Sequence, residues 1–417
     1  MRLRSERKDH GGCTLKLFFS VGEPSGDLHG ANLIRELQRR TGQVTARGLG
    51  GPRMQAAGCD LLRDMSDLAI MGLVPVLLKL PEFFRLLAQV EESLKADRPD
   101  AVVLIDYPGF NWHVAKKAKA LGIPVVYYGL PQLWAWLSHR VEKVRKYVDH
   151  PLCKLPFEEA WFRSQGCQAT YVGHPYFDEL KSHTLDEQFL SQFKNSSQRL
   201  VTLLPGSRRN EVSRNFPLQI RAARQILREQ PDVRFAVASY NEHQAAMAAK
   251  ILGQHDLPLV IIPKKTPELI HAATCCIAVS GSVSLELLYH AKPTVIQFNV
   301  AMPTYYIMKH LVKVQYMALP NLITTSELHP RCKQKYKRGA AIHEHVLFPE
   351  YPDWRDRSRD VASHVIEWLQ HEDRRQALIR RLEALRNQVA IGGASARAAD
   401  YILQHVVPQQ RPQSRAA

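Results

Sequence analysis

Two successive series of apolar and amphipathic segments constrain the fold of this chain more than any other feature of its sequence. In the first series, four segments have the length and apolar content of strands: residues 15–21, 45–49, 101–105 and 125–128. Two segments between them have a helical pattern: residues 28–40 and 114–121. Residues 101–105 are apolar without alternation, which is typical of a strand buried on both faces of a parallel sheet. This order of strands and helices favours a doubly wound parallel sheet.

The second half of the chain repeats the pattern. Its expected strands are residues 200–204, 234–238, 259–262, 276–279 and 294–298, and its expected helices are residues 216–230 and 283–290. The two halves meet near Gly173-His174-Pro175, and 417 residues suit two or three domains. We therefore predict an α/β protein with two Rossmann-like domains, residues 1–178 and 179–390. Residues 391–417 are expected to pack back as a helix or to be exchanged with a second copy. Two such halves commonly bind a ligand in the cleft between them.

The charge of the chain predicts an anionic partner. Its 56 Lys and Arg oppose 40 Asp and Glu, a formal net charge of +16. The partner could be nucleic acid, acidic lipid or a phosphorylated substrate. The alternative is a basic, solvated surface with no partner. No recognition helix or basic aromatic platform is recognisable, so a nucleic-acid partner is not expected.

Cysteine, histidine and apolar content limit the remaining classes. The 7 Cys residues are irregularly spaced, and Cys275 and Cys276 are adjacent, which favours reduced thiols and the cytoplasm. No apolar run approaches the roughly 20 residues of a membrane span. The His residues are scattered, so no metal site is predicted, and His343 and His345 in the Lys-rich segment 332–345 are expected at the surface.

The loop after the first strand is the first candidate site. It contains Glu23, Ser25, Gly26 and Asp27, and small residues at the start of a helix let the backbone approach an anionic ligand. Because the loop lacks the GxGxxG pattern, a nicotinamide cofactor is not supported. An ordinary turn, with Asp27 stabilising the helix start, explains the residues equally well.

Asp106 follows the buried strand 101–105 directly. At the carboxyl end of a strand in a doubly wound sheet, its carboxylate would face the ligand and could take a proton from an attacking hydroxyl. The alternative is an Asp that forms a turn or caps a helix. Further along, Trp134 and Trp136 suit an interface, a sugar platform or simple core packing.

The second half contains two candidate phosphate sites. Gly206-Ser207-Arg208 follows a strand, and an Arg guanidinium binds phosphate oxygens with two hydrogen bonds. Ser280-Gly281-Ser282 lies between a strand and a helix, with Glu286 one turn later, where it could accept hydrogen bonds from ribose hydroxyls. A surface basic pair and a capped helix are the respective alternatives.

One stretch, residues 70–87, suggests contact with a membrane. It is apolar on more than one helical face, carries Lys79 and Arg85, and is too short and interrupted to span a bilayer. It could lie in the interface of an acidic membrane, or it could be a buried helix under the sheet.

Several motifs, in this order, resemble the lipid A disaccharide synthase family. Besides the segments above, they are Gly50-Gly51-Pro52-Arg53-Met54, Met71-Gly72, Trp134-Ala135-Trp136, Leu155-Pro156-Phe157-Glu158, Val172-Gly173-His174-Pro175 and Leu319-Pro320-Asn321. The resemblance runs from about residue 15 to residue 406. It implies a GT-B glycosyltransferase, inverting and without metal or cofactor, at the cytoplasmic face of the inner membrane. The implied substrates are UDP-2,3-diacylglucosamine and 2,3-diacylglucosamine 1-phosphate (lipid X), and the products are the β-1,6-linked disaccharide 1-phosphate and UDP.

The resemblance also implies roles for residues of this chain. Asp106 would be the general base, and Glu23, Ser25, Gly26, Asp27, Trp134 and His174 would line the acceptor side. The donor would be bound by Gly206, Ser207, Arg208, Ser280, Gly281, Ser282, Glu286 and Asn321, the last contributed through a C-terminal swap in a homodimer. Membrane docking would use Val74, Val76, Leu77, Leu80 and Phe84.

The chain departs from the family pattern at five residues. Gly109 stands where a second Asp is usual, Leu130 where Ser is usual, Ser282 where Thr is usual, and Phe298-Asn299 where Tyr-Arg is common. Two alternatives therefore remain: another UDP-sugar transferase or epimerase of the same fold, and a non-catalytic paralogue that binds UDP or lipid.

Overall fold

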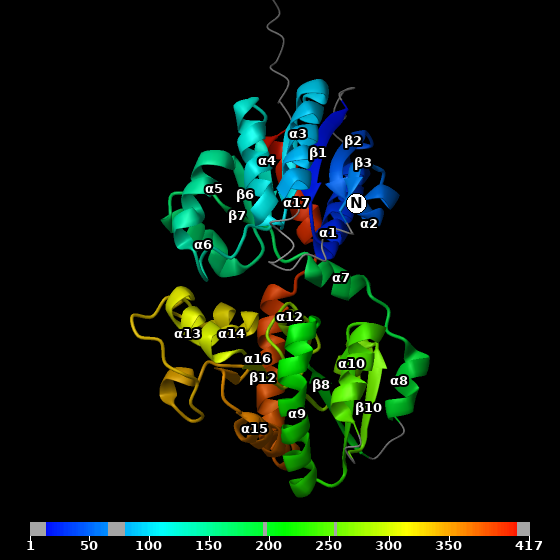
Figure 1. Ribbon diagram of the computed structural model, residues 1–417, viewed down its shortest axis with the longest axis vertical. Helices are drawn as coiled ribbons and strands as arrows, with labels where there is room; N and C mark the ends of the chain where they lie inside the picture. The colour runs from blue at the N-terminus through cyan, green and yellow to red at the C-terminus, as the bar shows by residue number, and fades with distance from the viewer. Residues whose placement is uncertain (1–13, 66–79, 195–197, 254–256, 407–417) are drawn as a thin grey trace, which may run out of the picture. The chain divides into compact units, whose positions relative to one another are not determined.

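The computed structural model describes residues 14–65, 80–194, 198–253 and 257–406, which form two compact units (Figure 1). The amino-terminal unit comprises Met1–Asp178 together with Gly392–Ala417, and the carboxy-terminal unit comprises Glu179–Ile391. The last segment of the chain therefore belongs to the same unit as the first.

A seven-stranded parallel sheet forms the centre of the amino-terminal unit, in the order β3-β2-β1-β4-β5-β6-β7. Its strands are β1 (Leu15–Val21), β2 (Val44–Gly50), β3 (Cys59–Asp64), β4 (Ala101–Ile105), β5 (Val125–Tyr128), β6 (His150–Cys153) and β7 (Thr170–Tyr171). Its helices are α1 (Pro24–Thr41), α2 (Pro52–Ala56), α3 (Leu80–Asp97), α4 (Pro108–Ala120), the 3-10 turn η2 (Ser138–Arg140), α5 (Val141–Tyr147), α6 (Pro156–Ser164), α7 (Tyr176–Ser182), which runs across the boundary between the units, and α17 (Ala394–His405). The strand order reverses direction at β1, between β2 and β4.

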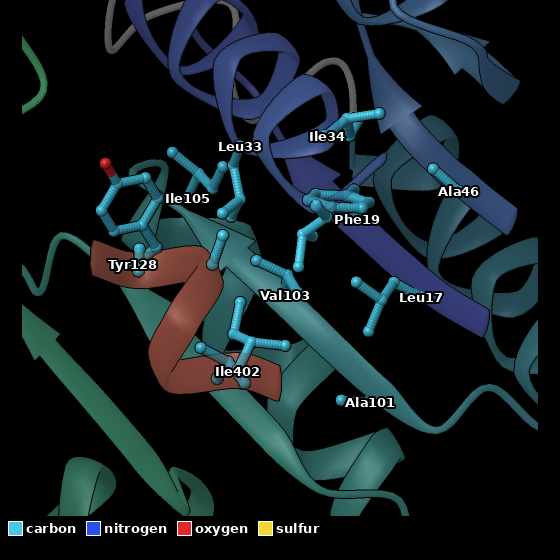
Figure 2. Packing of buried hydrophobic residues seen from close by; sticks show 14 of the residues in the cluster. Leu17, Phe19, Leu33, Ile34, Ala46, Ala101, Val103, Ile105, Tyr128 and Ile402 are labelled. Atoms are coloured by element: carbon cyan, nitrogen blue, oxygen red, sulfur yellow. The ribbon is translucent and has the colours of Figure 1, made fainter. Parts of the chain in front are cut away.

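Helices α1 and α17 pack side by side on one face of this sheet. Leu17, Phe19 and Val103 point from the strands toward Leu33 of α1 and Ile402 of α17 (Figure 2). Small residues on α17 (Ala398 and Ala399) are fully buried in the same cluster, and they let this helix approach the sheet closely. The final helix thus packs back on the sheet of its own chain.

The carboxylate of Asp178 caps the amino-terminal end of α17. It accepts hydrogen bonds from the backbone N–H groups of Gly393, Ala394 (3.3 Å) and Ser395 (3.1 Å). On the same helix, the Arg397 Nε donates to the carbonyl oxygen of Val172 at 2.8 Å. Because a helix start has N–H groups without helical partners, these bonds fix where the returning segment docks.

The carboxy-terminal unit has a six-stranded parallel sheet in the order β10-β9-β8-β11-β12-β13. Its strands are β8 (Arg199–Leu204), β9 (Val233–Ser239), β10 (Leu259–Pro263), β11 (Cys275–Ala278), β12 (Thr294–Asn299) and β13 (Glu350–Asp353). Its helices are α8 (Glu187–Lys194), α9 (Arg209–Glu229), α10 (Glu242–Leu252), α11 (Thr266–Ala272), α12 (Val283–Tyr289), α13 (Met302–Leu311), α14 (Leu319–Thr324), the 3-10 turn η3 (Ala341–His343), α15 (Ser358–Gln370) and α16 (Glu372–Val389). The strand order reverses at β8, between β9 and β11.

Helix α9 differs most from the sequence prediction. It begins at Arg209, seven residues before the expected start at Phe216, and it continues through Pro217. The Glu211 carboxylate accepts hydrogen bonds from the backbone N–H groups of Ser207 (3.0 Å) and Arg208 (3.1 Å) and so starts the helix early. This capping therefore sets the start of α9, and Pro217 lies inside the helix.

The Lys-rich segment also differs from expectation. His343 is buried rather than exposed, and its Nδ1 lies 3.0 Å from the Tyr316 hydroxyl. The His343 Nε2 lies 3.1 Å from the carbonyl oxygen of Lys335, within the segment itself. This histidine therefore anchors the segment to the unit. Five of the six described cysteines are buried, and all six are free thiols.

We expect Asp178→Ala to destabilise the protein by about 1–2 kcal/mol, because α17 loses its cap. Urea unfolding followed by circular dichroism measures the change. Asp400→Asn is the control, since the Asp400 ion pair with Arg40 also joins α17 to α1 but is more exposed. Equal losses in both variants would contradict a special role for the cap.

Candidate functional site

The carboxyl ends of several strands bring candidate residues together in the amino-terminal unit. Gly26 follows β1, Asp106 follows β4, Lys154 follows β6 and His174 follows β7. The order of strands reverses at β1 and β4, which is where doubly wound sheets bind ligands. Lys154 was not predicted from the sequence, although its place between a strand and the Leu155-Pro156-Phe157-Glu158 motif was a usable signal.

The backbone at Asp106 is held in an unusual conformation. Asp106 has a φ of 49° and Tyr107 a φ of 44°, in the left-handed region that side chains other than Gly rarely adopt. The carbonyl oxygen of Asp106 accepts hydrogen bonds from the Asn111 side chain and the Tyr127 hydroxyl, both at 2.8 Å. The Asn111 Nδ2 also donates to the Ser20 carbonyl oxygen at 3.1 Å, across to β1. These bonds maintain the strain and fix the direction of the Asp106 carboxylate.

An ion pair joins Asp106 to Lys154. The Lys154 Nζ lies 3.0 Å from the Asp106 Oδ1, and both side chains are about four-fifths buried, with exposed fractions of 18% and 20%. Burial by itself would lower the pKa of Lys154, but the Asp106 carboxylate outweighs it and the pKa is raised. Gly129 has a φ of 81°, and a Cβ there would lie 2.9 Å from the Lys154 Cδ, so this glycine makes room for the lysine.

The buried residues Trp134 and Glu158 position Lys154. The Trp134 Nε1 donates to the Glu158 carboxylate at 2.9 Å, and this carboxylate also accepts from the backbone N–H groups of Lys154 (2.9 Å) and Leu155 (3.0 Å). The Trp134 side chain is 1% exposed, so it supports the site from the core and cannot serve as a sugar platform. Trp136, by contrast, is half exposed.

Two neutral histidines, His29 and His174, lie near the ion pair of Asp106 and Lys154. Burial lowers the pKa of His29, on α1, to about 4, and the Asp106 carboxylate opposes this shift only in part. The His29 Nδ1 is buried without a hydrogen-bond partner. Burial, followed by repulsion from Lys154 and His29, holds the pKa of His174 well below its usual value. The His174 Nδ1 accepts a hydrogen bond from the backbone N–H of Tyr176, which leaves the Nε2 to carry the ring proton.

The first loop contributes shape more than polar groups. A Cβ at Gly26 would lie 3.7 Å from the Asp106 Oδ2, so the backbone passes close to the carboxylate. The Asp27 carboxylate is occupied, because it accepts hydrogen bonds from the backbone N–H groups of Gly51, Arg53 and Met54 at the start of α2. Asp27 therefore has a structural role, but it caps α2 and not the start of its own helix α1, which the alternative interpretation expected. Glu23 and Ser25 are exposed.

Gly109 is exposed, and apart from the adjacent residues and the backbone of its own helix no described atom lies within 4 Å of the position that its Cβ would occupy. An Asp would fit there, so this departure from the family pattern has no steric cause.

Most of the predicted membrane-docking residues lie outside the described part of the chain. Val74, Val76 and Leu77 belong to residues 66–79, and Leu80 begins α3. Phe84 is described, and its side chain is 59% exposed on α3. None of the described helices is long and apolar enough to cross a membrane.

In the carboxy-terminal unit, Gly206, Ser207 and Arg208 connect β8 to α9. Gly206 has a φ of 115°, and a Cβ there would lie 2.5 Å from the Glu211 Cβ, so only glycine suits this turn. The Arg208 side chain is 82% exposed and lies 3.0 Å from the Glu211 Oε1. An exposed guanidinium at the strand end is positioned to exchange this contact for a phosphate.

The neighbouring strand β11 is followed by Ser280, Gly281 and Ser282. Gly281 and Ser282 are exposed, while the Ser280 hydroxyl donates to the Met317 carbonyl oxygen at 3.2 Å. Glu286 is almost fully buried on α12. Because β8 and β11 are adjacent, the two predicted donor segments lie at neighbouring strand ends in one sheet.

Asn321 requires a correction. Its side chain is fully buried, with its Oδ1 accepting from the N–H groups of Leu347 and Phe348, both at 3.0 Å. Its Nδ2 donates to the Phe348 carbonyl oxygen at 2.7 Å and to the Glu350 carboxylate at 2.6 Å. All its hydrogen-bonding capacity is used within the unit, so the predicted donor contact lacks a polar atom to make it.

The residues that the structure describes contain no group of three or more His, Cys, Asp or Glu side chains that could hold a metal ion.

Comparison with known proteins identifies the family. Residues 17–380 match the model of the lipid-A-disaccharide synthetase family. The chain belongs to this family. It is 33% identical to the lipid-A-disaccharide synthase of Trichlorobacter lovleyi over 392 residues, covering 94% of this chain and 97% of the relative. It is also 33% identical to that of Nitrosococcus oceani, covering 89% and 92%. The predicted family is confirmed, and with it the prediction of a glycosyltransferase.

Solved structures confirm the predicted α/β class with two Rossmann-like domains. A UDP-GlcNAc 2-epimerase from Neisseria meningitidis bound to UDP-GlcNAc has a TM-score of 0.61 at 12% identity, covering 94% of this chain and 99% of that one. A calicheamicin glycosyltransferase has a TM-score of 0.54 at 17% identity, covering 95% and 100%. Similarity at this level of identity establishes the fold alone.

We expect His29→Asn to reduce the loss of stability on acidification. Folded His29, with its pKa near 4 instead of 6.5, resists a proton that the unfolded chain accepts between these values. The contribution of His29 to the free energy of unfolding is therefore fully present above pH 6.5 and is lost as the pH approaches 4. Between about pH 7 and pH 5 the loss is about 2 kcal/mol. Urea unfolding at both pH values measures the difference. His139→Asn, at an exposed site in the same unit, is the control, and equal pH slopes would contradict the assignment.

Proposed function

We propose that this chain transfers 2,3-diacylglucosamine from UDP-2,3-diacylglucosamine to 2,3-diacylglucosamine 1-phosphate (lipid X). The products are the β-1,6-linked disaccharide 1-phosphate and UDP. The observation that carries the proposal is the Asp106 carboxylate at the strand-order reversal, in a chain that matches the synthetase family over residues 17–380. The UDP-GlcNAc bound to one protein of similar fold supports a UDP-sugar donor.

In the proposed reaction, Asp106 takes the proton of the acceptor 6-hydroxyl. The hydroxyl oxygen attacks the anomeric carbon of the donor sugar from the face opposite UDP. The bond from that carbon to the diphosphate oxygen breaks, and its electron pair leaves with UDP, so the configuration inverts. Lys154 contacts the Oδ1 of Asp106, whereas the Oδ2 lies on the Gly26 side. In the proposal, the acceptor hydroxyl approaches the Oδ2, the oxygen that does not contact the lysine.

The basic residues of the carboxy-terminal unit suit the leaving group. Arg208 would bind the donor diphosphate, with the exposed Gly281 and Ser282 at the adjacent strand end. Such contacts would stabilise the charge that develops on UDP as the bond breaks. We propose that this charge is neutralised by protein groups without a metal ion.

Further parts of the proposal concern location and assembly. The two acylated substrates favour a chain bound to the cytoplasmic face of the inner membrane, and the exposed Phe84 suits such contact. The homodimer with an exchanged C-terminal segment stays a prediction. In the single chain, α17 occupies its place on the sheet of its own unit.

A turnover assay in mixed micelles tests the reaction. We expect wild-type protein with both substrates and EDTA to release UDP and form disaccharide. Asp106→Asn keeps the shape of the side chain but loses the base, so turnover should fall by about 10²–10⁴-fold while UDP still binds.

Asp60→Asn, an exposed carboxylate of the same unit, is the matched control and should retain full turnover. Near-normal turnover of Asp106→Asn would exclude Asp106 as the base, and a requirement for added metal would exclude the metal-free mechanism. If wild-type protein binds UDP but forms no disaccharide, the chain is the non-catalytic paralogue or uses another acceptor.

Arg208→Ala should weaken UDP binding by about 10–100-fold, because charge-assisted hydrogen bonds to the diphosphate are lost. Isothermal titration calorimetry measures the affinity. Arg209→Ala removes the same charge one residue later, also at an exposed position, and should change the affinity little. Equal effects of the two substitutions would indicate a general loss of positive field and not a diphosphate contact.

A further inference from the structure

An exposed apolar helix lies in the carboxy-terminal unit, far in sequence from the predicted docking stretch 70–87. Helix α13 (Met302–Leu311) contains no buried residue, which is unusual for a helix of an α/β unit. Four of its large apolar side chains are 45–58% exposed: Met302, Tyr306, Ile307 and Leu311. Figure 1 shows this helix, in yellow, near α14.

The exposed residues form one broad face of the helix. Met302 and Tyr306 are one turn apart, as are Ile307 and Leu311, so the two pairs lie along adjacent rows of the helix surface. Tyr305 and Met308, on the opposite side, are only half-buried against the unit. A contiguous apolar surface of this kind is typical of a contact with a partner or a membrane.

The sequence that contains this face is rich in basic residues, of which Lys335 and Arg338 form ion pairs with Asp353 and Glu367. Between residues 300 and 345 the sequence has seven Lys and Arg (Lys309, Lys313, Arg331, Lys333, Lys335, Lys337 and Arg338) against two acidic residues, Glu327 and Glu344. Lys309 and Lys313 extend from the end of the helix and are exposed. Of the other five, four belong to the Lys-rich segment and Arg331 directly precedes it.

The structure holds the Lys-rich segment beside α13. The Lys333 Nζ donates to the Lys309 carbonyl oxygen at 2.9 Å, at the last turn of the helix. The Lys335 Nζ lies 5.0 Å from the centre of the Tyr305 ring. The backbone N–H of Gln334 donates to the Gln315 side chain at 3.1 Å. These contacts, together with buried His343, place the basic segment along the exposed helix.

We infer that α13 and the Lys-rich segment form a second membrane-binding surface, which takes an anionic bilayer. The apolar side chains enter the interface while the lysines meet acidic headgroups, a combination that recurs in helices lying on membranes. A second copy of this chain fits less well. In a two-fold symmetric interface the same face meets itself, and the basic residues of the two copies would repel each other.

The inference extends the proposed membrane association and rests on different residues from the stretch 70–87. It needs neither catalysis nor UDP-sugar binding, so its test can fail while the proposed reaction holds. Because two surfaces would contribute, substitutions in α13 should weaken membrane binding without abolishing it.

Co-sedimentation of the full-length chain with vesicles tests the inference. The probe is phosphatidylcholine vesicles with and without about 30% phosphatidylglycerol. We expect Ile307→Ser with Leu311→Ser to lower the partition coefficient by about tenfold or more. Lys309→Gln with Lys337→Gln should lower it by about fivefold for each charge, and only on anionic vesicles. Added salt should weaken wild-type binding.

Val260→Ser is the matched control, since this residue of β10 is similarly exposed in the same unit. Circular dichroism establishes that each variant is folded. Unchanged partition of both double variants would overturn the inference, as would binding that ignores phosphatidylglycerol and salt. Light scattering gives a further test: if Ile307→Ser with Leu311→Ser dissociates a dimer and leaves vesicle binding intact, α13 is a self-association surface and the inference is wrong.

Discussion

The side-chain amide of Asn111 joins the two central strands of the amino-terminal unit at the point on which its chemistry depends. It accepts a hydrogen bond from the Ser20 hydroxyl at 2.7 Å and donates to the carbonyl oxygens of Ser20 and Asp106. The left-handed backbone at Asp106 and Tyr107 costs on the order of 1–3 kcal/mol per residue. This conformation persists because Asn111 is fully buried. Breaking its hydrogen bonds would deprive its amide, and the carbonyl oxygens of Ser20 and Asp106, of these partners. The orientation of the proposed base is thus a property of the core.

The electrostatics of the same site follow from its burial. Lys154 forms an ion pair with Asp106. Its backbone N–H donates to the Glu158 carboxylate, which the Trp134 Nε1 also binds, and these bonds position the lysine. Burial keeps His29 and His174 neutral, so they add no competing positive charge next to the carboxylate. Lys154 thus pairs with the Oδ1 of Asp106, and the Oδ2 lies toward Gly26.

Several residues of recognisable motifs support the fold instead of contacting a ligand. Asp27 starts α2, Trp134 packs under Lys154, and Asn321 ties the Glu350 carboxylate to the segment before it. In each case the polar atoms are used by backbone or buried partners. The residues that remain exposed, such as Arg208 and Ser282, lie in the loops that follow strands. Motif membership therefore indicates importance without distinguishing support from contact.

The sequence by itself determined the elements whose pattern is local. The strands at residues 15–21, 101–105 and 125–128 have the predicted limits, because a largely apolar run bounded by turn residues is typical of a buried strand in a parallel sheet. The position of Asp106 at a strand end followed from the same pattern, and the motif order was enough for the family. Four strands escaped prediction. The strands β6, β7 and β13 have only two to four residues and carry too little periodicity, and three of the six residues of β3 are charged.

Only the tertiary structure decided which distant residues meet. The pairing of Asp106 with Lys154, 48 residues later, and the capping of α17 by Asp178, 215 residues earlier, depend on strand order and chain return. The burial of Asn321 and His343 likewise depends on neighbours that local sequence does not name. Hydrogen bonds and ion pairs act over a few ångströms in space, whereas sequence patterns describe neighbours along the chain. Only folding brings residues that are distant in the chain within that range.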